Sequence, residues 1–368
     1  MSSRSEVSRR VISDKYRPVY EGDMPAILEG LAGSLSGTSD IVTEYEQALA
    51  AWFDSRHAVA VSSGAAAISV ALGTLGVKPG DEVVLTPTCP LCTVYPVMSA
   101  GARPVFVDTR PHGFGVDLKD LAKVITPRTK AIIDIPMWGY PTEVDELHAV
   151  ARGRSIPLIL DLAHSHGSKL HGKHLSHYAD MSCFSTHERK PLATGEGGFI
   201  LTDNLELADR CRSYSRFGNL NGKDFGLNYK LAALSACLGR SRLEHLEGQV
   251  EARRRNAHYI VSRITHPKVS EKQIIADSSP NYYFLNLSLS FRDNRKFIDY
   301  LDENGIPSDI KRYGCRCLYE FPAIAAYARQ CPNGEHLLNS MTTIPIHPDL
   351  KEGDLSYIVE LINDYSED

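Results

Sequence analysis

An apolar run that ends in an acid constrains the fold of this chain more than any other feature. Residues 156–160 read Ile-Pro-Leu-Ile-Leu and contain no charged side chain. Such a run is typical of a strand that is buried on both faces of a parallel sheet. Asp161 follows it directly. Because open α/β sheets bind ligands at the carboxyl ends of their strands, the sequence predicts that Asp161 lies at a ligand site.

A lysine follows a second short strand. Residues 181–185 form that predicted strand, and Lys190 lies between it and the glycine-rich turn at 195–198. An acid and a lysine presented from two strand ends suit a pyridoxal 5′-phosphate (PLP) site. The lysine can form a Schiff base with the aldehyde, and Asp161 can keep the pyridinium nitrogen protonated. The alternative for Lys190 is an ordinary surface cation, which its place before a glycine turn argues against.

The block around Lys190 resembles the DegT/DnrJ/EryC1/StrS family of PLP-dependent sugar aminotransferases, which have fold type I. The resemblance extends from about Ser36 to the C-terminus. It implies an α/β fold in which a large domain carries a mostly parallel seven-stranded sheet flanked by helices, followed by a smaller α+β domain. We therefore expect an N-terminal arm at 1–20, the large PLP-binding domain at 21–245 and the small C-terminal domain at 246–368.

The alternation of apolar runs and amphipathic segments also favours a mostly parallel sheet with right-handed crossovers. The further strands expected are at 57–61, 83–85, 102–108, 130–135, 199–201, 282–287 and 306–312, the last of them exposed. The helices expected are at 24–35, 41–53, 65–75, 118–125, 142–152, 205–212, 242–258, 294–304 and 355–365, and a long helix is expected to open at 227–230.

A turn of small residues joins the strand at 57–61 to its helix. Free backbone N–H groups at the start of that helix can bind phosphate, although a tight strand-to-helix turn without a ligand has the same composition. In the family this turn binds the PLP phosphate, so the resemblance assigns Gly64, Ala65 and Ala66 to the cofactor. Ala65 replaces the usual hydroxyl residue, and the backbone must supply the contact there.

The resemblance implies further contacts with PLP. His164 stands where the family usually has a glutamine that binds the 3′-oxygen, and an imidazole N–H could replace it; a purely structural histidine is the alternative. Ser185 would donate to the phosphate. The usual aromatic over the ring is missing, so Cys89 or Pro90 would cover the ring face, or Tyr95 could approach from further along the chain.

Asn228 matches an asparagine that, in the family, contacts the PLP phosphate of the neighbouring subunit. The alternative is that Asn228 caps the helix expected from this point of the chain. The family role would require two chains for each site, and it therefore implies a homodimer with shared active sites.

Composition argues against several other classes of protein. The net charge of −5 provides no electrostatic case for nucleic acid binding, and no apolar run reaches membrane-spanning length. The eight cysteines do not form two well-spaced pairs, so no metal site is expected. No secretory signal is visible near Met1, and we expect a cytoplasmic protein.

The resemblance implies an aminotransferase of natural-product or polysaccharide biosynthesis. It would move an amino group from glutamate or glutamine to a keto group of a nucleotide-linked sugar or a cyclitol, with Lys190 as Schiff base and proton shuttle. One alternative is PLP-dependent elimination, dehydration or oxidation, but the family's dehydrases carry histidine in place of this lysine. The other is a non-catalytic PLP-binding regulator. The sequence shows no added DNA-binding segment, which argues against this alternative.

Overall fold

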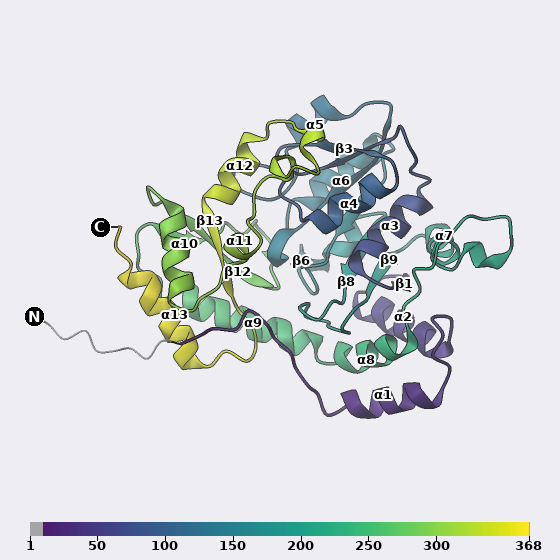
Figure 1. The fold of residues 1–368 in the computed structure, drawn as a ribbon, viewed down its shortest axis with the longest axis horizontal. Helices are drawn as coiled ribbons and strands as arrows, with labels where there is room; N and C mark the ends of the chain where they lie inside the picture. The colour runs from purple at the N-terminus through teal and green to yellow at the C-terminus, as the bar shows by residue number, and fades with distance from the viewer. Residues whose placement is uncertain (1–9, 368) are drawn as a thin grey trace, which may run out of the picture.

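The computed structural model describes residues 10–367, which contain a seven-stranded sheet between two layers of helices (Figure 1). The strand order is β1-β9-β8-β5-β4-β2-β3. Only β9 runs against the other strands. The strands are β1 (His57–Val61), β2 (Glu82–Leu85), β3 (Arg103–Phe106), β4 (Thr129–Asp134), β5 (Leu158–Asp161), β8 (Met181–Ser185) and β9 (Gly198–Thr202). The predicted fold class is confirmed.

Neighbouring residues of the central strands pack against opposite helical layers. Ile159 belongs to the apolar cluster of α3 (Gly64–Thr74), α4 (Leu91–Ser99) and α7 (Leu205–Ser215). Leu160 belongs to the cluster of the second layer, which contains α2 (Asp40–Trp52), α5 (Leu118–Val124), α6 (Val144–Gly153) and α8 (Ala233–Leu243). Because side chains alternate along a strand, the side chain of Asp161 faces α3 and α4.

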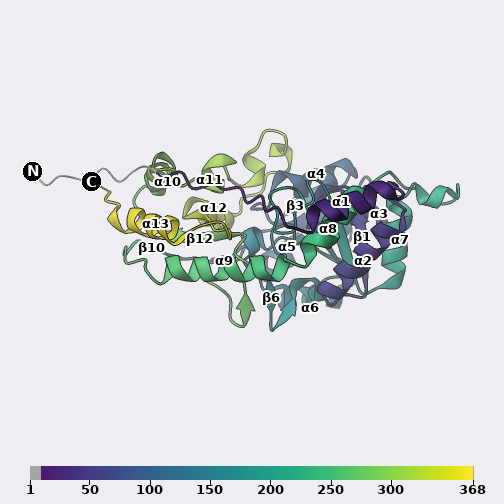
Figure 2. The ribbon, with the colours of Figure 1, turned by 90° about the horizontal axis from the view of Figure 1, so that it is seen from below.

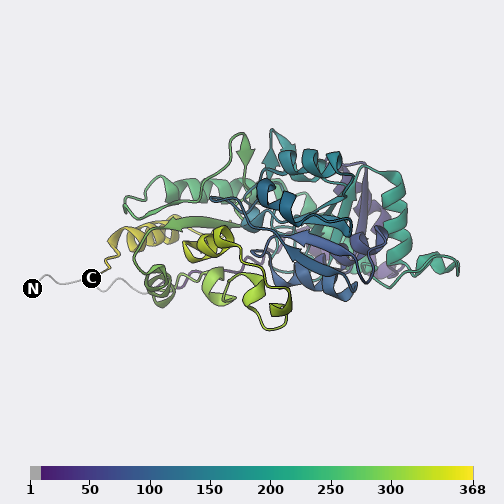
Figure 3. The same ribbon diagram turned by 90° about the horizontal axis from the view of Figure 1, so that it is seen from above.

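A smaller antiparallel sheet lies at the other end of the elongated molecule (Figures 2 and 3). Its strands are β10 (Val269–Glu271), β12 (Phe284–Leu289) and β13 (Met341–Pro345), in that order. Helix α9 (Leu246–Val261) runs from α8 towards this sheet (Figure 1). The remaining helices of this end are α10 (Asn294–Glu303), α11 (Asp309–Arg312), α12 (Pro332–Asn339) and α13 (Glu352–Asp364).

The N-terminal segment contacts both ends of the molecule before α1 (Asp23–Ala32) begins (Figure 2). The amide of Ile12 donates to the carbonyl of Gly305 after α10, at 2.9 Å. Further along, Arg242 of α8 donates to the carbonyl of Pro18, at 3.0 Å. Part of the arm predicted at 1–20 falls on residues 1–9, which lie outside the described residues.

The strand predicted at 306–312 is wrong. Ile306 is buried, and α11 begins three residues later, at Asp309. The Ser308 hydroxyl accepts from the amide of Ile310 at 3.2 Å, which is the helix N-cap hydrogen bond. The apolar residues of this segment therefore pack inward from a turn and a short helix instead of lining an exposed strand.

The long helix predicted from residue 227 is also wrong at its start. α8 begins at Ala233, and the residues before it are extended. The amide of Leu227 donates to the carbonyl of Tyr214 at 2.7 Å, and the carbonyl of Tyr229 accepts from Ser62 at 2.8 Å. These long-range partners replace the hydrogen bonds of a helical turn.

Several elements were not predicted, among them α4, α12, β10 and β13. A third small sheet has the order β11-β6-β7 and consists of β11 (Ser278–Ser279), β6 (Lys169–Leu170) and β7 (Lys173–His174). Within residues 10–367, no helix combines the length and the apolar character that crossing a membrane requires.

Candidate active site

Asp161 ends β5 as a buried carboxylate whose hydrogen-bond donors are both uncharged. Thr93 of α4 donates its hydroxyl to Oδ2 at 2.6 Å, and the amide of Ala163 donates to Oδ1 at 3.1 Å. Burial raises the pKa of Asp161, while the Thr93 hydrogen bond and the charge of Lys190 oppose the rise. A cationic partner would relieve the cost of this buried charge.

Lys190 follows β8 in a tight turn, in which its amide donates to the carbonyl of His187 at 2.8 Å. Its Nζ lies 4.9 Å from the centre of the Tyr283 ring. Burial lowers the pKa of Lys190, against the raising effects of Cys92, Asp161 and Asp309. A lowered pKa makes the amine a better nucleophile and base near neutral pH.

His164 presents a neutral imidazole next to this lysine. Its ring stacks on Tyr283, with centroids 4.6 Å apart, and its Nδ1 accepts from the amide of Trp138 at 3.3 Å. This hydrogen bond assigns the ring proton to Nε2. Burial, followed by the charge of Lys190, holds the pKa of His164 well below its usual range. His164 can therefore donate from Nε2, as its predicted role requires.

The start of α3 lies against the end of β8. A Cβ on Gly64 would be 2.7 Å from the Cβ of Ser185, so only glycine allows this approach. The Ser63 hydroxyl accepts from the amide of Ala66 at 3.0 Å. The preceding amides, those of Gly64 and Ala65, have no acceptor within a helix. These donors and the Ser185 hydroxyl form a seat suited to a phosphate.

The residues considered for the ring face lie at the start of α4. Pro90 is the N-cap residue, and Cys89 is buried. Burial, then the charge of Asp161, holds the pKa of the Cys89 thiol well above its usual range. Tyr95 follows Thr93 by two residues, which places the two side chains on nearly opposite sides of a helix. Because Thr93 contacts Asp161 and Tyr95 is 42 % exposed, the geometry favours Cys89 or Pro90.

Asn228 makes no hydrogen bond to Asp161 or Lys190 within the described residues of this chain. Its side chain is exposed, and its Oδ1 accepts from Lys230 Nζ at 2.6 Å. The residue pairs with Arg216 in an isolated β-bridge. It does not cap a helix, so the alternative role considered for Asn228 is excluded.

The comparison with protein families matches residues 23–363 to the DegT/DnrJ/EryC1/StrS aminotransferase family. The chain belongs to this family. The predicted resemblance is therefore confirmed over nearly the whole chain.

Two curated relatives of this DegT/DnrJ/EryC1/StrS protein carry names of different kinds, one a regulatory protein and the other an aminotransferase. The "Pleiotropic regulatory protein" of Geobacillus stearothermophilus is 28 % identical over 363 residues, covering 96 % of this chain and 97 % of that protein. The "UDP-2-acetamido-2-deoxy-3-oxo-D-glucuronate aminotransferase" of Pseudomonas aeruginosa is 30 % identical over 322 residues, covering 86 % and 88 %.

Among solved structures, the sugar aminotransferase CalS13 from Micromonospora echinospora is similar over the whole fold. The TM-score is 0.88 at 26 % identity, and the match covers 96 % of this chain and 99 % of that one.

Four residues that border the site were not predicted: Thr93, Trp138, Tyr283 and Asp309. Trp138 follows β4. Ligand sites lie at the carboxyl ends of the strands in open α/β sheets, and this rule, which singled out Asp161 after β5, would also have found Trp138. Trp138 has a positive φ of 51°, which no simple pattern predicts for a tryptophan. Tyr283 and Asp309 come from the C-terminal part of the chain, and the sequence carries no signal that they return to this edge of the sheet.

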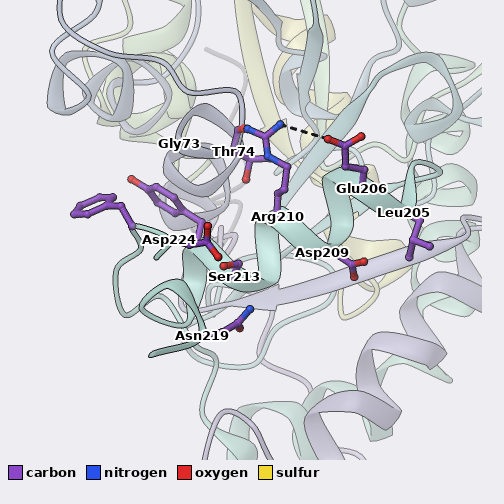
Figure 4. A pocket seen from close by; sticks show the side chains of 11 residues that line it. Gly73, Thr74, Leu205, Glu206, Asp209, Arg210, Ser213, Asn219 and Asp224 are labelled. Atoms are coloured by element: carbon purple, nitrogen blue, oxygen red, sulfur yellow. Dashed lines mark hydrogen bonds and ion pairs between the residues drawn. The ribbon is translucent and has the colours of Figure 1, made fainter. Parts of the chain in front are cut away.

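A surface cavity of about 800 Å³ lies away from Asp161 and Lys190 (Figure 4). It is bordered by Gly73 and Thr74 at the end of α3, by α7 and by the loop that follows α7. Because a helix rises about 1.5 Å per residue, this end of α3 is roughly 15 Å from Gly64. In the cavity, Arg210 lies 3.9 Å from Glu206 and also donates to the carbonyl of Thr74. The cavity is thus separate from the predicted phosphate seat.

Proposed function

We propose that this protein is a PLP-dependent aminotransferase that passes nitrogen from glutamate or glutamine to the keto group of a nucleotide-linked sugar or a cyclitol. The observation that carries the proposal is the buried Asp161 at the end of β5 near a lysine of lowered pKa. The names of the Pseudomonas relative and of CalS13 support the sugar acceptor.

The residues present fit PLP. Among residues 10–367, the groups that donate to Asp161 are uncharged, so a protonated ring nitrogen would neutralise it. His164 offers its Nε2 proton to the 3′-oxygen. The amides of Gly64 and Ala65 would bind the phosphate, with Ser185 beside them, whereas the predicted Ala66 amide already donates to Ser63. Cys89 or Pro90 would cover the ring.

When bound, PLP supplies an electron sink that stabilises negative charge on the substrate carbon. With its lowered pKa, the Lys190 amine would be the group that bonds to the cofactor aldehyde. The same amine would serve as the base that moves a proton from the substrate carbon, because its lowered pKa keeps a larger fraction of it unprotonated. Asp161 would hold a proton on the ring nitrogen of the bound cofactor.

We further propose a homodimer in which Asn228 reaches the phosphate of the partner's site. The loop at 216–228 projects from the body of the molecule (Figure 3). It carries exposed apolar side chains, with Phe217, Leu220 and Phe225 at 45 %, 82 % and 74 % exposure. Apolar side chains gathered on a projecting loop are typical of an interface. A cytoplasmic site of action is part of the proposal, because all eight cysteines are free thiols.

The visible spectrum of the PLP-loaded protein tests this function. Glutamate or glutamine, added without an acceptor, should shift the absorption band, and the 2-oxo acid of the same donor should restore it. A protein that binds PLP but whose absorption band does not change with any amine would favour the regulator instead. The name of the Geobacillus relative points to that alternative. Release of ammonia or water from the added compound, without a reversible shift, would favour elimination or dehydration.

A further inference from the structure

A largely enclosed arginine directly precedes Lys190 and is surrounded by acids and a tyrosine. Arg189 Nη2 lies 2.5 Å from Asp14 Oδ2 and 3.4 Å from Asp309 Oδ1. Its Nη1 donates to the Tyr313 hydroxyl. The Arg189 side chain is 12 % exposed, so this guanidinium is held inside the protein and is not a solvated surface charge.

One donor of this guanidinium is unused. Arg189 Nε is buried and has no hydrogen-bond partner among the described residues. A buried N–H without an acceptor is unfavourable, and arginine binds carboxylates through paired N–H groups. Nε together with one Nη group therefore offers a two-pronged site to an incoming carboxylate.

The two contacts to acids differ in strength. Asp14 is close to Arg189 and is shared with Arg312, whose Nη1 is 2.5 Å from the same oxygen. Asp309 makes the longer contact, at 3.4 Å, and its other oxygen accepts from the indole of Trp138 at 3.2 Å. Asp309 is therefore the acid that a ligand would displace more easily, and it keeps a hydrogen bond when displaced.

The same residues connect Arg189 to the reacting centre. Trp138 donates its backbone amide to His164 and its indole N–H to Asp309. The charges of Asp309 and Arg189 both act on Lys190, with opposite signs. Arg189 thus lies beside the amine and the imidazole that the proposed reaction uses.

We propose that Arg189 binds the carboxylate of the amino donor, and that Asp309 holds the guanidinium when the substrate carries no carboxylate at that place. This rests on the proposed function. An amino-acid donor carries a carboxylate on the reacting carbon itself, whereas the reacting carbon of a keto sugar carries none. The diphosphate of a nucleotide-linked sugar is separated from that carbon by part of the ring, so a cation adjacent to Lys190 suits the donor.

Binding of a compound that cannot react provides the first readout. Calorimetric titration of the PLP-loaded and PLP-free protein with glutarate should give a dissociation constant that rises about 10–100-fold in Arg189→Gln, the loss expected for charge-assisted hydrogen bonds. Arg189→Lys keeps the charge but loses the paired N–H donors of the guanidinium, so its dissociation constant for glutarate should lie between those of the wild type and Arg189→Gln. It also replaces Arg189→Gln if that variant does not fold.

Kinetics provide the second readout. The KM for glutamate should rise in Arg189→Gln while the KM for the acceptor changes less than about threefold. Asp309→Asn removes the competing charge and should shift the glutarate dissociation constant in the opposite direction, to about one fifth of its value. Arg17→Gln is the matched control, because Arg17 pairs with Glu188 of the same turn at 3.2 Å but its side chain is 61 % exposed.

The outcomes separate this inference from the proposed function. Binding of glutarate that depends on Arg189, in a protein that transaminates nothing, would support the carboxylate site and overturn the aminotransferase. The carboxylate site would be overturned if the protein transaminates but neither substitution of Arg189 changes ligand binding. In that case the glutarate dissociation constant and the KM for glutamate would be the same in the wild type, Arg189→Gln and Arg189→Lys. No binding of glutarate to the wild type would also overturn it.

Discussion

The hydroxyl of Thr93 lies 2.6 Å from Oδ2 of Asp161, so α4 places a hydrogen-bond donor on the acid that ends β5. This donor lowers the pKa of Asp161 against the effect of burial. We expect Thr93→Val, which keeps the shape but removes the hydroxyl, to destabilise the fold by about 1–3 kcal/mol. Thr93→Ser keeps the donor and should cost less. Denaturant unfolding of the three proteins measures the difference.

The same substitution should change how PLP retention depends on pH. Without the Thr93 hydrogen bond, the pKa of Asp161 rises further, so the carboxylate is protonated at a higher pH as the solution is acidified. The pH at which the protein loses PLP should therefore move upward in Thr93→Val. An unchanged or lower midpoint would mean that Asp161 does not hold the cofactor.

A side chain on Gly64 should damage the phosphate seat. The new Cβ of Gly64→Ala would meet the Cβ of Ser185 at 2.7 Å, and overpacking of this kind costs about 1–3 kcal/mol. We expect weaker PLP binding and lower stability. Gly113→Ala is the control, because no atom lies within 4 Å of its added Cβ. If both substitutions have equally small effects, α3 does not need its close approach to β8.

A buried histidine should make stability depend on pH. Burial lowers the pKa of His166 to about 3, from an ordinary value of 6.5. Between these values the unfolded chain binds one more proton than the folded chain, so the free energy of unfolding rises with pH. From pH 7.5 to pH 5 this group should remove about 2 kcal/mol of stability.

His166→Phe should lose that part of the pH dependence. The imidazole ring lies 5.2 Å from the Phe184 ring and 6.1 Å from the Phe199 ring, centre to centre, so an aromatic replacement keeps the packing. The measurement is the slope of the unfolding free energy against pH in both proteins. Equal slopes would show that His166 is protonated to the same extent in the folded and unfolded chains.

Two inactive variants should complement each other if Asn228 serves the partner's site. Lys190→Ala removes the amine, and Asn228→Ala removes the proposed phosphate contact. In a mixed dimer one site would have both residues and the other neither. We expect unfolding and refolding of an equal mixture to recover about a quarter of wild-type activity. An activity no greater than the average of the two variants would place Asn228 at its own chain's site or outside both sites.

Local patterns predicted the sheet because its strands are apolar runs that lie between helical layers. The edge rule for parallel sheets singled out Asp161 and, with the glycine turn, Lys190. The same reasoning missed Thr93, which lies 68 residues before Asp161 in a helix whose sequence contains β-branched residues and Pro96. Local propensity does not favour that helix, and packing against α3 and the sheet stabilises it.

The errors have a similar cause. The segment at 306–312 was predicted as an exposed strand, but its two isoleucines are four residues apart and hydrogen bonds of Ser308 make it a turn and a short helix. Asp309 and Arg189 meet across 120 residues of sequence. Such pairs depend on how the C-terminal part of the chain returns to the large sheet, and no pattern within either segment contains that information.

The central claim is that Lys190 bonds covalently to PLP opposite Asp161. The most direct measurement is reduction of the PLP-loaded protein with borohydride, which fixes a carbon–nitrogen bond between a lysine and the cofactor, followed by peptide mass mapping. We predict that the modification lies on Lys190, and that Lys190→Ala carries none. A modification on a different lysine, or a protein that binds PLP without any reducible bond, would contradict the claim.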